Sequence, residues 1–140
     1  MRNNLKKLEI FCFLLLFISF RVSAPCWQAL PVTGPHPSEP YRQLLNAVAM
    51  VETANDTLAY NPLEEASGIL QIRPVRLVEY NRRTGSNYTR KDLFSYEVSE
   101  KIFMYFASEI GPYNLEKIAR NWNGSGEMTN NYWKRIKQYL

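Results

Sequence analysis

The chain has 140 residues, which is room for one small domain and a short leader. Hydrophobic residues make up 46% of it and charged residues 21%, a balance that favours a packed core over a disordered chain. Most of the net charge of +4 belongs to residues 1–24, because the rest of the chain carries 13 basic and 12 acidic side chains, and this near-neutral remainder gives no electrostatic reason to bind nucleic acid.

Residues 1–24 have the three parts of a signal peptide. The N-terminal end is basic, an almost entirely apolar run extends from Ile10 to Phe20, and small residues precede a predicted cleavage after Ala24. The apolar run is shorter than a bilayer-spanning helix needs. We therefore predict an exported protein, periplasmic or extracellular, with no other contact with a membrane. Because Pro25 disfavours cleavage just before it, an uncleaved N-terminal anchor is the alternative.

Residues 25–40 are rich in proline, which predicts an extended linker. The one histidine of the chain, His36, lies in this linker, and Cys26 is the one cysteine after the leader. These residues cannot form an internal disulfide, a catalytic triad or a histidine-rich zinc site. We expect neither a metal nor a cofactor, so an enzyme of this sequence would use carboxylates, hydroxyls or amides.

Residues 41–140 are predicted to form one mainly α-helical domain. Apolar residues at helical spacing, together with proline and glycine at helix ends, predict helices over residues 41–52, from Pro74 to about Arg83, over 96–110, around Leu115–Trp122, and from Tyr132 to Tyr139. Between the first two helices, residues 58–72 are expected to contain a short irregular or β segment.

Glu52 is an acidic residue on the apolar face of the first predicted helix. It follows Leu45 by seven positions and Val48 by four, so the three side chains point the same way. A carboxyl group removed from water tends to stay protonated, and a protonated carboxyl can donate its proton to the leaving oxygen of a glycosidic bond. On periodicity alone, the alternative is that Glu52 turns into solvent at a frayed helix end.

Three short motifs follow one another along the domain. Glu52-Thr53 ends the first predicted helix, Ser67-Gly68-Ile69-Leu70-Gln71-Ile72 comes next, and Trp122-Asn123-Gly124 lies near the C-terminal end. This order resembles the soluble lytic transglycosylase family of lysozyme-like domains, over about residues 41–139. That family has a catalytic Glu before Ser or Thr, a Gly-Leu-Met-Gln-Ile-type segment and a Tyr-Asn-Ala-Gly-type segment. The resemblance implies a lysozyme-like (goose-type) helical fold.

The resemblance also implies roles for individual residues. Glu52 would be the catalytic acid and base, and the substrate-binding residues would be Thr53, Ser67, Gly68, Gln71, Trp122 and Asn123. Trp122 and Gly124 replace the family's Tyr and Ala, and Leu70 replaces its Met. Plainer structural roles are the alternative: Gln71 could satisfy backbone groups, Gly68 could permit a tight turn, and Trp122 could belong to the core.

The implied substrate is the glycan strand of peptidoglycan. The resemblance implies cleavage between N-acetylmuramic acid and N-acetylglucosamine, with one Glu as acid and base and a 1,6-anhydro product. Hydrolysis of the same bond, as in a lysozyme-type muramidase, is the close alternative. It needs a second group to place a water molecule, for which the chain offers Asp56, Glu64 and Glu65.

Two further alternatives are a non-catalytic peptidoglycan-binding module and a secreted protein-interaction domain. The sequence leaves the oligomeric state open. Six basic residues lie close together in the middle of the chain, where they could steer an anionic glycan or simply form a solvated surface: Arg73, Arg76, Arg82, Arg83, Arg90 and Lys91.

Overall fold

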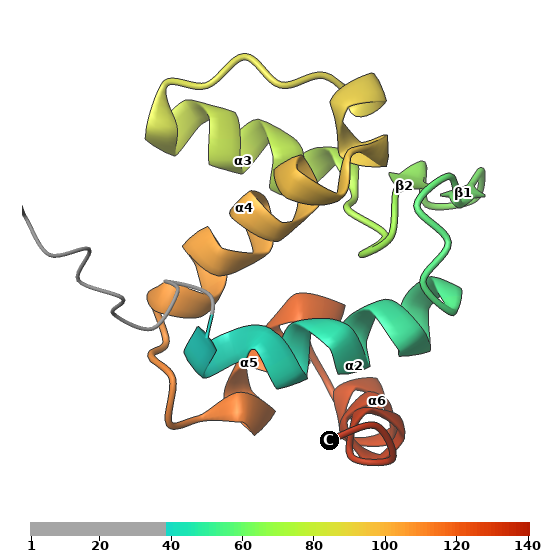
Figure 1. The fold of residues 1–140 in the computed structure, drawn as a ribbon, viewed down its shortest axis with the longest axis vertical. Helices are drawn as coiled ribbons and strands as arrows, with labels where there is room; N and C mark the ends of the chain where they lie inside the picture. The colour runs from blue at the N-terminus through green and yellow to red at the C-terminus, as the bar shows by residue number, and fades with distance from the viewer. Residues whose placement is uncertain (1–38) are drawn as a thin grey trace, which may run out of the picture. The chain divides into compact units, whose positions relative to one another are not determined.

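The computed structural model describes residues 39–140, which fold into a mainly α-helical domain with one small sheet (Figure 1). In chain order the elements are the short 3-10 helix η1 (Glu39–Tyr41), α2 (Arg42–Thr53), β1 (Tyr60–Asn61), β2 (Ala66–Ser67), α3 (Pro74–Thr84), the 3-10 helix η2 (Arg90–Phe94), α4 (Tyr96–Ser108), α5 (Leu115–Asn123) and α6 (Met128–Ile136). The mainly α-helical prediction is confirmed. Within this part of the chain, no helix has the length and hydrophobicity to cross a membrane.

The predicted leader and nearly all of the predicted linker lie outside the described residues. At the linker's end, Glu39 and Pro40 begin η1, which leads directly into α2. This last part of residues 25–40 is therefore helical rather than extended.

Helix α2 carries Glu52 to the edge of the core. Its apolar stripe, including Leu45 and Val48, is buried as predicted, and the helix contacts α5 and α6. It ends because Ala54 and Asn55 both adopt left-handed backbone conformations, with φ of 53° and 69°. Their N–H groups bond back to carbonyls of the last turn, which closes the helix just after Glu52.

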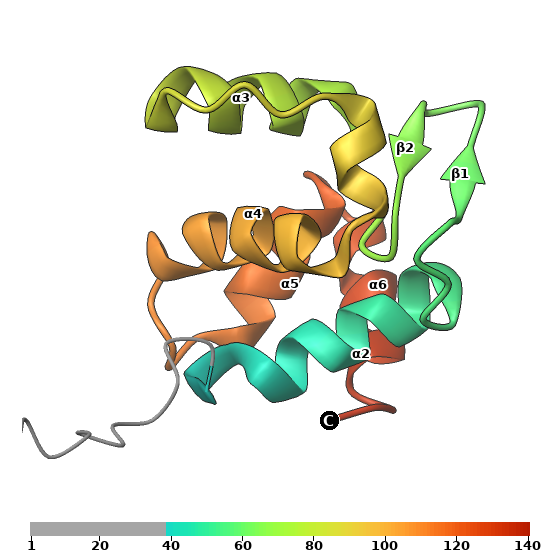
Figure 2. The same cartoon turned by 45° about the horizontal axis from the view of Figure 1, so that its top comes forward.

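The segment between α2 and α3 is a β-hairpin, as the prediction for residues 58–72 allowed. Strands β1 and β2 pair antiparallel, with Tyr60 opposite Ser67. Ser67 also pairs with Ile72, which folds the intervening residues into a tight turn. Figure 2 shows the hairpin beside the C-terminal end of α2. The second motif is thereby brought next to Glu52.

Helix α3 has the boundaries that its end signals predict. Pro74 occupies its first turn, where the absent N–H costs nothing, and Gly85 ends it with φ of 71°. The next helix, α4, starts at Tyr96 as predicted but ends at Ser108, two residues before the predicted end. The two helices pack together through Tyr80 and Tyr105, whose rings meet edge to face at 5.3 Å.

Helices α5 and α6 pack against each other and against α2. Trp122 on α5 and Tyr132 and Ile136 on α6 are buried, as their spacing predicted. The predicted bounds of the last helix, Tyr132 to Tyr139, are wrong at both ends, because α6 already begins at Met128. Helix α6 ends at Ile136, the backbone continues in tight turns, and Tyr139 is 49% exposed, so its side chain has no core surface to cover.

Candidate functional site

A small pocket of about 60 Å³ brings together residues from all three sequence motifs. Its walls come from the end of α2, the hairpin and the turn after it, the start of α3 and the end of α5. The residues that line it are Glu52, Glu64, Gln71, Arg73, Arg76, Trp122 and Asn123. Four of these belong to the site that the resemblance implies: Glu52, Gln71, Trp122 and Asn123.

Glu52 lies in this pocket rather than in open solvent. Its Oε1 accepts a 2.7 Å hydrogen bond from the hydroxyl of Tyr132. Burial raises the pKa of the Glu52 carboxyl, and the hydrogen bond from Tyr132 and the charges of Arg135 and Arg73 only partly oppose that rise. Glu64 adds a smaller upward effect. The balance favours a protonated carboxyl at a higher pH than an exposed glutamate would allow.

Tyr132 is a site residue that the sequence did not reveal. It stands in the apolar stripe of α6, 80 positions after Glu52, and its spacing predicted only that it is buried. Burial, and then the nearby carboxyl of Glu52, raise the pKa of Tyr132, so the phenol remains a hydrogen-bond donor. Arg135 of the same helix donates a 2.8 Å hydrogen bond to the carbonyl of Val51. Helix α6 therefore holds the end of α2 through two hydrogen bonds, one to the Glu52 carboxyl and one to the backbone just before it.

Thr53, Ser67 and Gly68 do not line the pocket, in contrast to the role that the resemblance implies. The Thr53 hydroxyl donates a 2.9 Å hydrogen bond to the carbonyl of Ile69, which ties α2 to the hairpin turn. Ser67 is fully buried, and its hydroxyl has no hydrogen-bond partner among the described residues. The side chains of Thr53 and Ser67 are thus engaged in backbone contacts or in the core rather than in the pocket.

Gly68 is required by sterics. Its φ is 76°, and a Cβ atom at this position would lie 1.9 Å from the carbonyl oxygen of Leu93. Its own N–H donates to the carbonyl of Ala59 at 2.9 Å. Gly68 therefore permits a tight turn, which is the plainer alternative considered for it. The close approach of η2 is a second reason why only glycine fits at this position.

Gln71 both bonds to the backbone of the hairpin turn and lines the pocket. Its backbone is left-handed, with φ of 49°, and its Nε2 donates to the carbonyls of Gly68 at 3.1 Å and Ala59 at 3.4 Å. The amide therefore satisfies backbone groups of the turn. Its side chain also lines the pocket, and its Oε1 accepts no hydrogen bond from the described residues. This oxygen can accept one from a ligand hydroxyl or amide.

Trp122 is mainly a core residue. It is 5% exposed, its Nε1 donates a 3.1 Å hydrogen bond to the carbonyl of Leu70, and its ring meets Phe103 edge to face at 5.0 Å. The guanidinium of Arg76 lies over the ring, 4.6 Å from its centroid. Sugar stacking on this ring is therefore not available, and Trp122 instead forms the floor of the pocket and holds the second motif to α5.

Asn123 is the last residue of α5 and lines the pocket. Its backbone carbonyl accepts a 2.7 Å hydrogen bond from Arg73. Its side-chain amide makes no hydrogen bond to the described residues. The amide NH2 can therefore donate, and the amide oxygen accept, a hydrogen bond to a polar group that enters the pocket.

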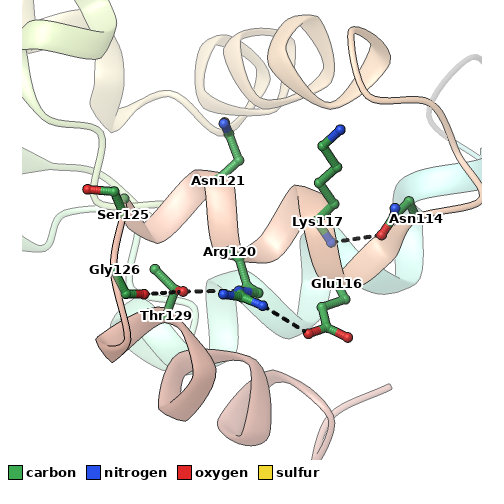
Figure 3. Close-up of a pocket in the computed structure, with 9 residues that line it drawn as sticks. Asn114, Glu116, Lys117, Arg120, Asn121, Ser125, Gly126 and Thr129 are labelled. Atoms are coloured by element: carbon green, nitrogen blue, oxygen red, sulfur yellow. Dashed lines mark hydrogen bonds and ion pairs between the residues drawn. The ribbon is translucent and has the colours of Figure 1, made fainter.

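A larger pocket of about 400 Å³ lies along α5 and the loop that leads to α6 (Figure 3). None of the predicted site residues lines it. Its central side chain, Arg120, bonds to Thr129 at 3.0 Å and to Glu116 at 3.4 Å. Its size exceeds that of the Glu52 pocket, but its acidic side chain, Glu116, is exposed and pairs with Arg120. The Glu52 pocket, which gathers residues of all three motifs, is therefore the candidate functional site.

Comparisons of the chain with protein-family models, with curated proteins and with solved structures found no match.

Proposed function

We propose that the protein is an exported lytic transglycosylase that cleaves peptidoglycan glycan strands, with Glu52 as its catalytic acid and base. One observation carries the proposal: a glutamate whose pKa is raised by burial shares a pocket with Gln71 and Asn123. These are the residues of three separate motifs whose order resembles that family. We propose a lysozyme-like fold for residues 41–140 on the same ground.

In the proposed reaction, protonated Glu52 donates its proton to the oxygen between N-acetylmuramic acid and N-acetylglucosamine. The bond between this oxygen and the anomeric carbon of the muramic sugar breaks. The acetamido oxygen of the same sugar then bonds to the anomeric carbon, giving an oxazolinium intermediate. The Glu52 carboxylate then removes the proton of the sugar's 6-hydroxyl, whose oxygen displaces the acetamido group. The product is a 1,6-anhydro end, and Glu52 is again protonated. This series of reaction steps needs one enzyme carboxylate rather than the two that most glycosidases use.

The pocket provides groups that suit this reaction. Tyr132 holds the Glu52 carboxyl in place through its 2.7 Å hydrogen bond. The free Oε1 of Gln71 and the side-chain amide of Asn123 line the same space. They are suited to bind the N-acetyl and hydroxyl groups of the two sugars.

Hydrolysis is the second candidate, and one observation favours a particular residue for it. Of the three acidic residues that the sequence offered, Glu64 alone lines the pocket. Its charge also acts on Glu52, because it contributes to the raised pKa. Asp56 instead accepts a hydrogen bond from the N–H of Leu58 in the turn after α2. In a muramidase mechanism, Glu64 would orient the attacking water.

Mass spectrometry of reaction products tests the proposal. The protein purified from expression of the full-length chain is incubated with purified peptidoglycan, with Glu52→Gln as the inactive variant. Glu127→Gln, at an exposed residue that does not line the pocket, is the matched control. We expect soluble anhydro-muropeptides from the unaltered protein and the control, and none from Glu52→Gln. Hydrated muropeptides would instead indicate a muramidase. Binding without release would indicate a non-catalytic module, and absence of binding a protein-interaction domain.

A further inference from the structure

Helix α2 ends with a backbone carbonyl that its own helix does not satisfy. In a regular helix, the N–H of Asn55 would bond to the carbonyl of Val51. Here it bonds to the carbonyl of Ala49 instead, at 3.2 Å, because Ala54 and Asn55 are left-handed. The Val51 carbonyl, which belongs to the peptide group just before Glu52, therefore needs a partner from elsewhere in the fold.

Arg135 of α6 is that partner. Its Nη2 donates a 2.8 Å hydrogen bond to the Val51 carbonyl, across 84 positions of the chain. The last carbonyls of a helix carry partial negative charge, so a guanidinium is well suited to this place. Arg135 therefore caps α2 from a different helix, at the peptide group that joins Val51 to Glu52.

Arg135 reaches α2 from the same side of α6 as Tyr132. The two residues are three positions apart on this helix, a spacing that places side chains on one face. Tyr132 bonds to the carboxyl of Glu52, and Arg135 bonds to the backbone before it. One face of α6 thus offers the proposed acid a neutral donor and, close by, a positive charge.

Charged groups from three parts of the fold surround the Glu52 carboxyl. Arg135 comes from α6, Arg73 and Arg76 from the start of α3, and Glu64 from the hairpin. Among these charges, Arg135 lowers the pKa of Glu52 the most, Arg73 lowers it less, and Glu64 raises it. Helix α6 therefore supplies the main positive charge that favours the ionised carboxyl.

The proposed reaction needs a charge of this kind. When Glu52 donates its proton, a carboxylate remains in a partly buried pocket, where burial disfavours it. A positive charge that is already in place offsets this cost without any rearrangement during the reaction. The side chain of Arg135 is exposed, so water screens its charge. Glu52 therefore keeps enough proton affinity to act as the base in the second step.

We propose that Arg135 is a positioning residue for the proposed reaction. It caps the end of α2 so that Glu52 keeps its place, and its fixed charge stabilises the carboxylate that remains after proton donation. The inference rests on the proposed function and adds to it a residue that lies outside the three motifs and outside the lining of the pocket. Arg135 acts through Glu52 and not on the substrate.

Three substitutions of Arg135 separate the cap from the charge. Arg135→Gln keeps an N–H donor for the Val51 carbonyl and removes the charge, Arg135→Lys keeps a donor and the charge, and Arg135→Met removes both. Lys134→Gln removes an equal charge from the neighbouring exposed residue, which is not among the groups that act on Glu52, and is the matched control. Clearing of a peptidoglycan suspension is measured across pH. Carboxyl NMR measures the pKa of Glu52 separately, without substrate.

We expect Arg135→Gln to move the alkaline limb of the kcat/KM profile to higher pH, because loss of the positive charge favours the protonated form of Glu52. It should also lower kcat on the plateau by about two- to fivefold, as for an exposed charge pair. Arg135→Lys should restore the limb, and Lys134→Gln should leave it in place. Arg135→Met should move the limb as Arg135→Gln does and also lower the urea midpoint of unfolding, because the Val51 carbonyl loses its donor.

Two results would overturn the inference. If Arg135→Gln leaves both the alkaline limb and the NMR pKa of Glu52 unchanged, Arg135 is a helix cap only. If Lys134→Gln moves the limb as far as Arg135→Gln does, net charge rather than position is the cause. Both would leave the proposed function intact, because the unaltered protein would still release anhydro-muropeptides. If the unaltered protein releases no product at any pH, the proposed function fails, and this inference fails with it.

Discussion

The hydroxyl of Tyr132 lies 2.7 Å from Oε1 of Glu52 and joins the last helix of the fold to the end of the first long one. The bond stabilises the charged form of the carboxyl, whereas burial disfavours it more strongly. These two opposing effects are the largest on the pKa of Glu52, ahead of the charges of Arg135, Arg73 and Glu64.

Replacing Tyr132 with Phe should raise the pKa of Glu52 further, because it removes the largest effect that lowers it. The proposed first step needs the protonated acid, so the alkaline limb of the kcat/KM profile should move to higher pH. Loss of the bond should also destabilise the fold by about 1 kcal/mol. Clearing of a peptidoglycan suspension across pH measures the first effect. Tyr139→Phe, at an exposed ring, is the control. A limb that stays in place or moves to lower pH would contradict the assignment.

Replacing Glu52 with Gln should lower activity by about 10²–10⁴-fold while the protein stays folded. It should also change how stability depends on pH. A carboxyl whose pKa is raised in the folded state contributes stability that is fully present below its ordinary value of 4.5 and is lost as pH rises through the raised value. Urea denaturation at a series of pH values should show this loss in the unaltered protein and not in Glu52→Gln. Identical pH dependence in both proteins would show that Glu52 is not buried.

Replacing Gly68 with Ala should destabilise the fold by about 3 kcal/mol or more, because the new methyl group meets the carbonyl of Leu93 and the backbone is left-handed. Gly85→Ala is a matched control. Its φ of 71° is similar, but no atom lies within 4 Å of the added carbon. That change should cost only about 1 kcal/mol. Thermal unfolding of both variants compares them, and equal losses would mean that contact with η2 is unimportant.

Replacing Glu64 with Gln should separate the two candidate reactions. For a transglycosylase, the products should remain anhydro-muropeptides. The pKa of Glu52 should fall slightly, because Glu64 raises it, so the alkaline limb should move to lower pH. For a muramidase that uses Glu64 to place water, the rate should instead fall by about 10²-fold or more. Product masses and rates from one digestion series distinguish these outcomes.

Much of the fold could be predicted because helical periodicity and end signals are local. The spacing of Leu45, Val48 and Glu52 on one helix needs no knowledge of the rest of the chain. Pro74 and Gly85 likewise marked the ends of α3 correctly. The error at Tyr139 has the opposite cause: its spacing continues the stripe of α6, but spacing cannot reveal that no partner surface lies there.

The membership of the pocket depended on long-range packing. Glu52, Gln71 and Asn123 were named from motif order, and the structure brings them together. Thr53 and Ser67 were named on the same ground, yet their side chains turn to the backbone or into the core. Motif order identifies segments that meet, but it does not determine which way each side chain points.

The sequence by itself determined where most of the helices lie, the turn-rich segment between α2 and α3, and the acidic residue on an apolar face, because each follows from contacts within a few residues of chain. The tertiary structure decided that Tyr132 reaches Glu52 and that Arg73 and Arg76 meet the end of α5. These contacts join residues that are 45 to 80 positions apart. Periodicity states which face of a helix is buried, and only the packing of one helix on another determines what that face meets.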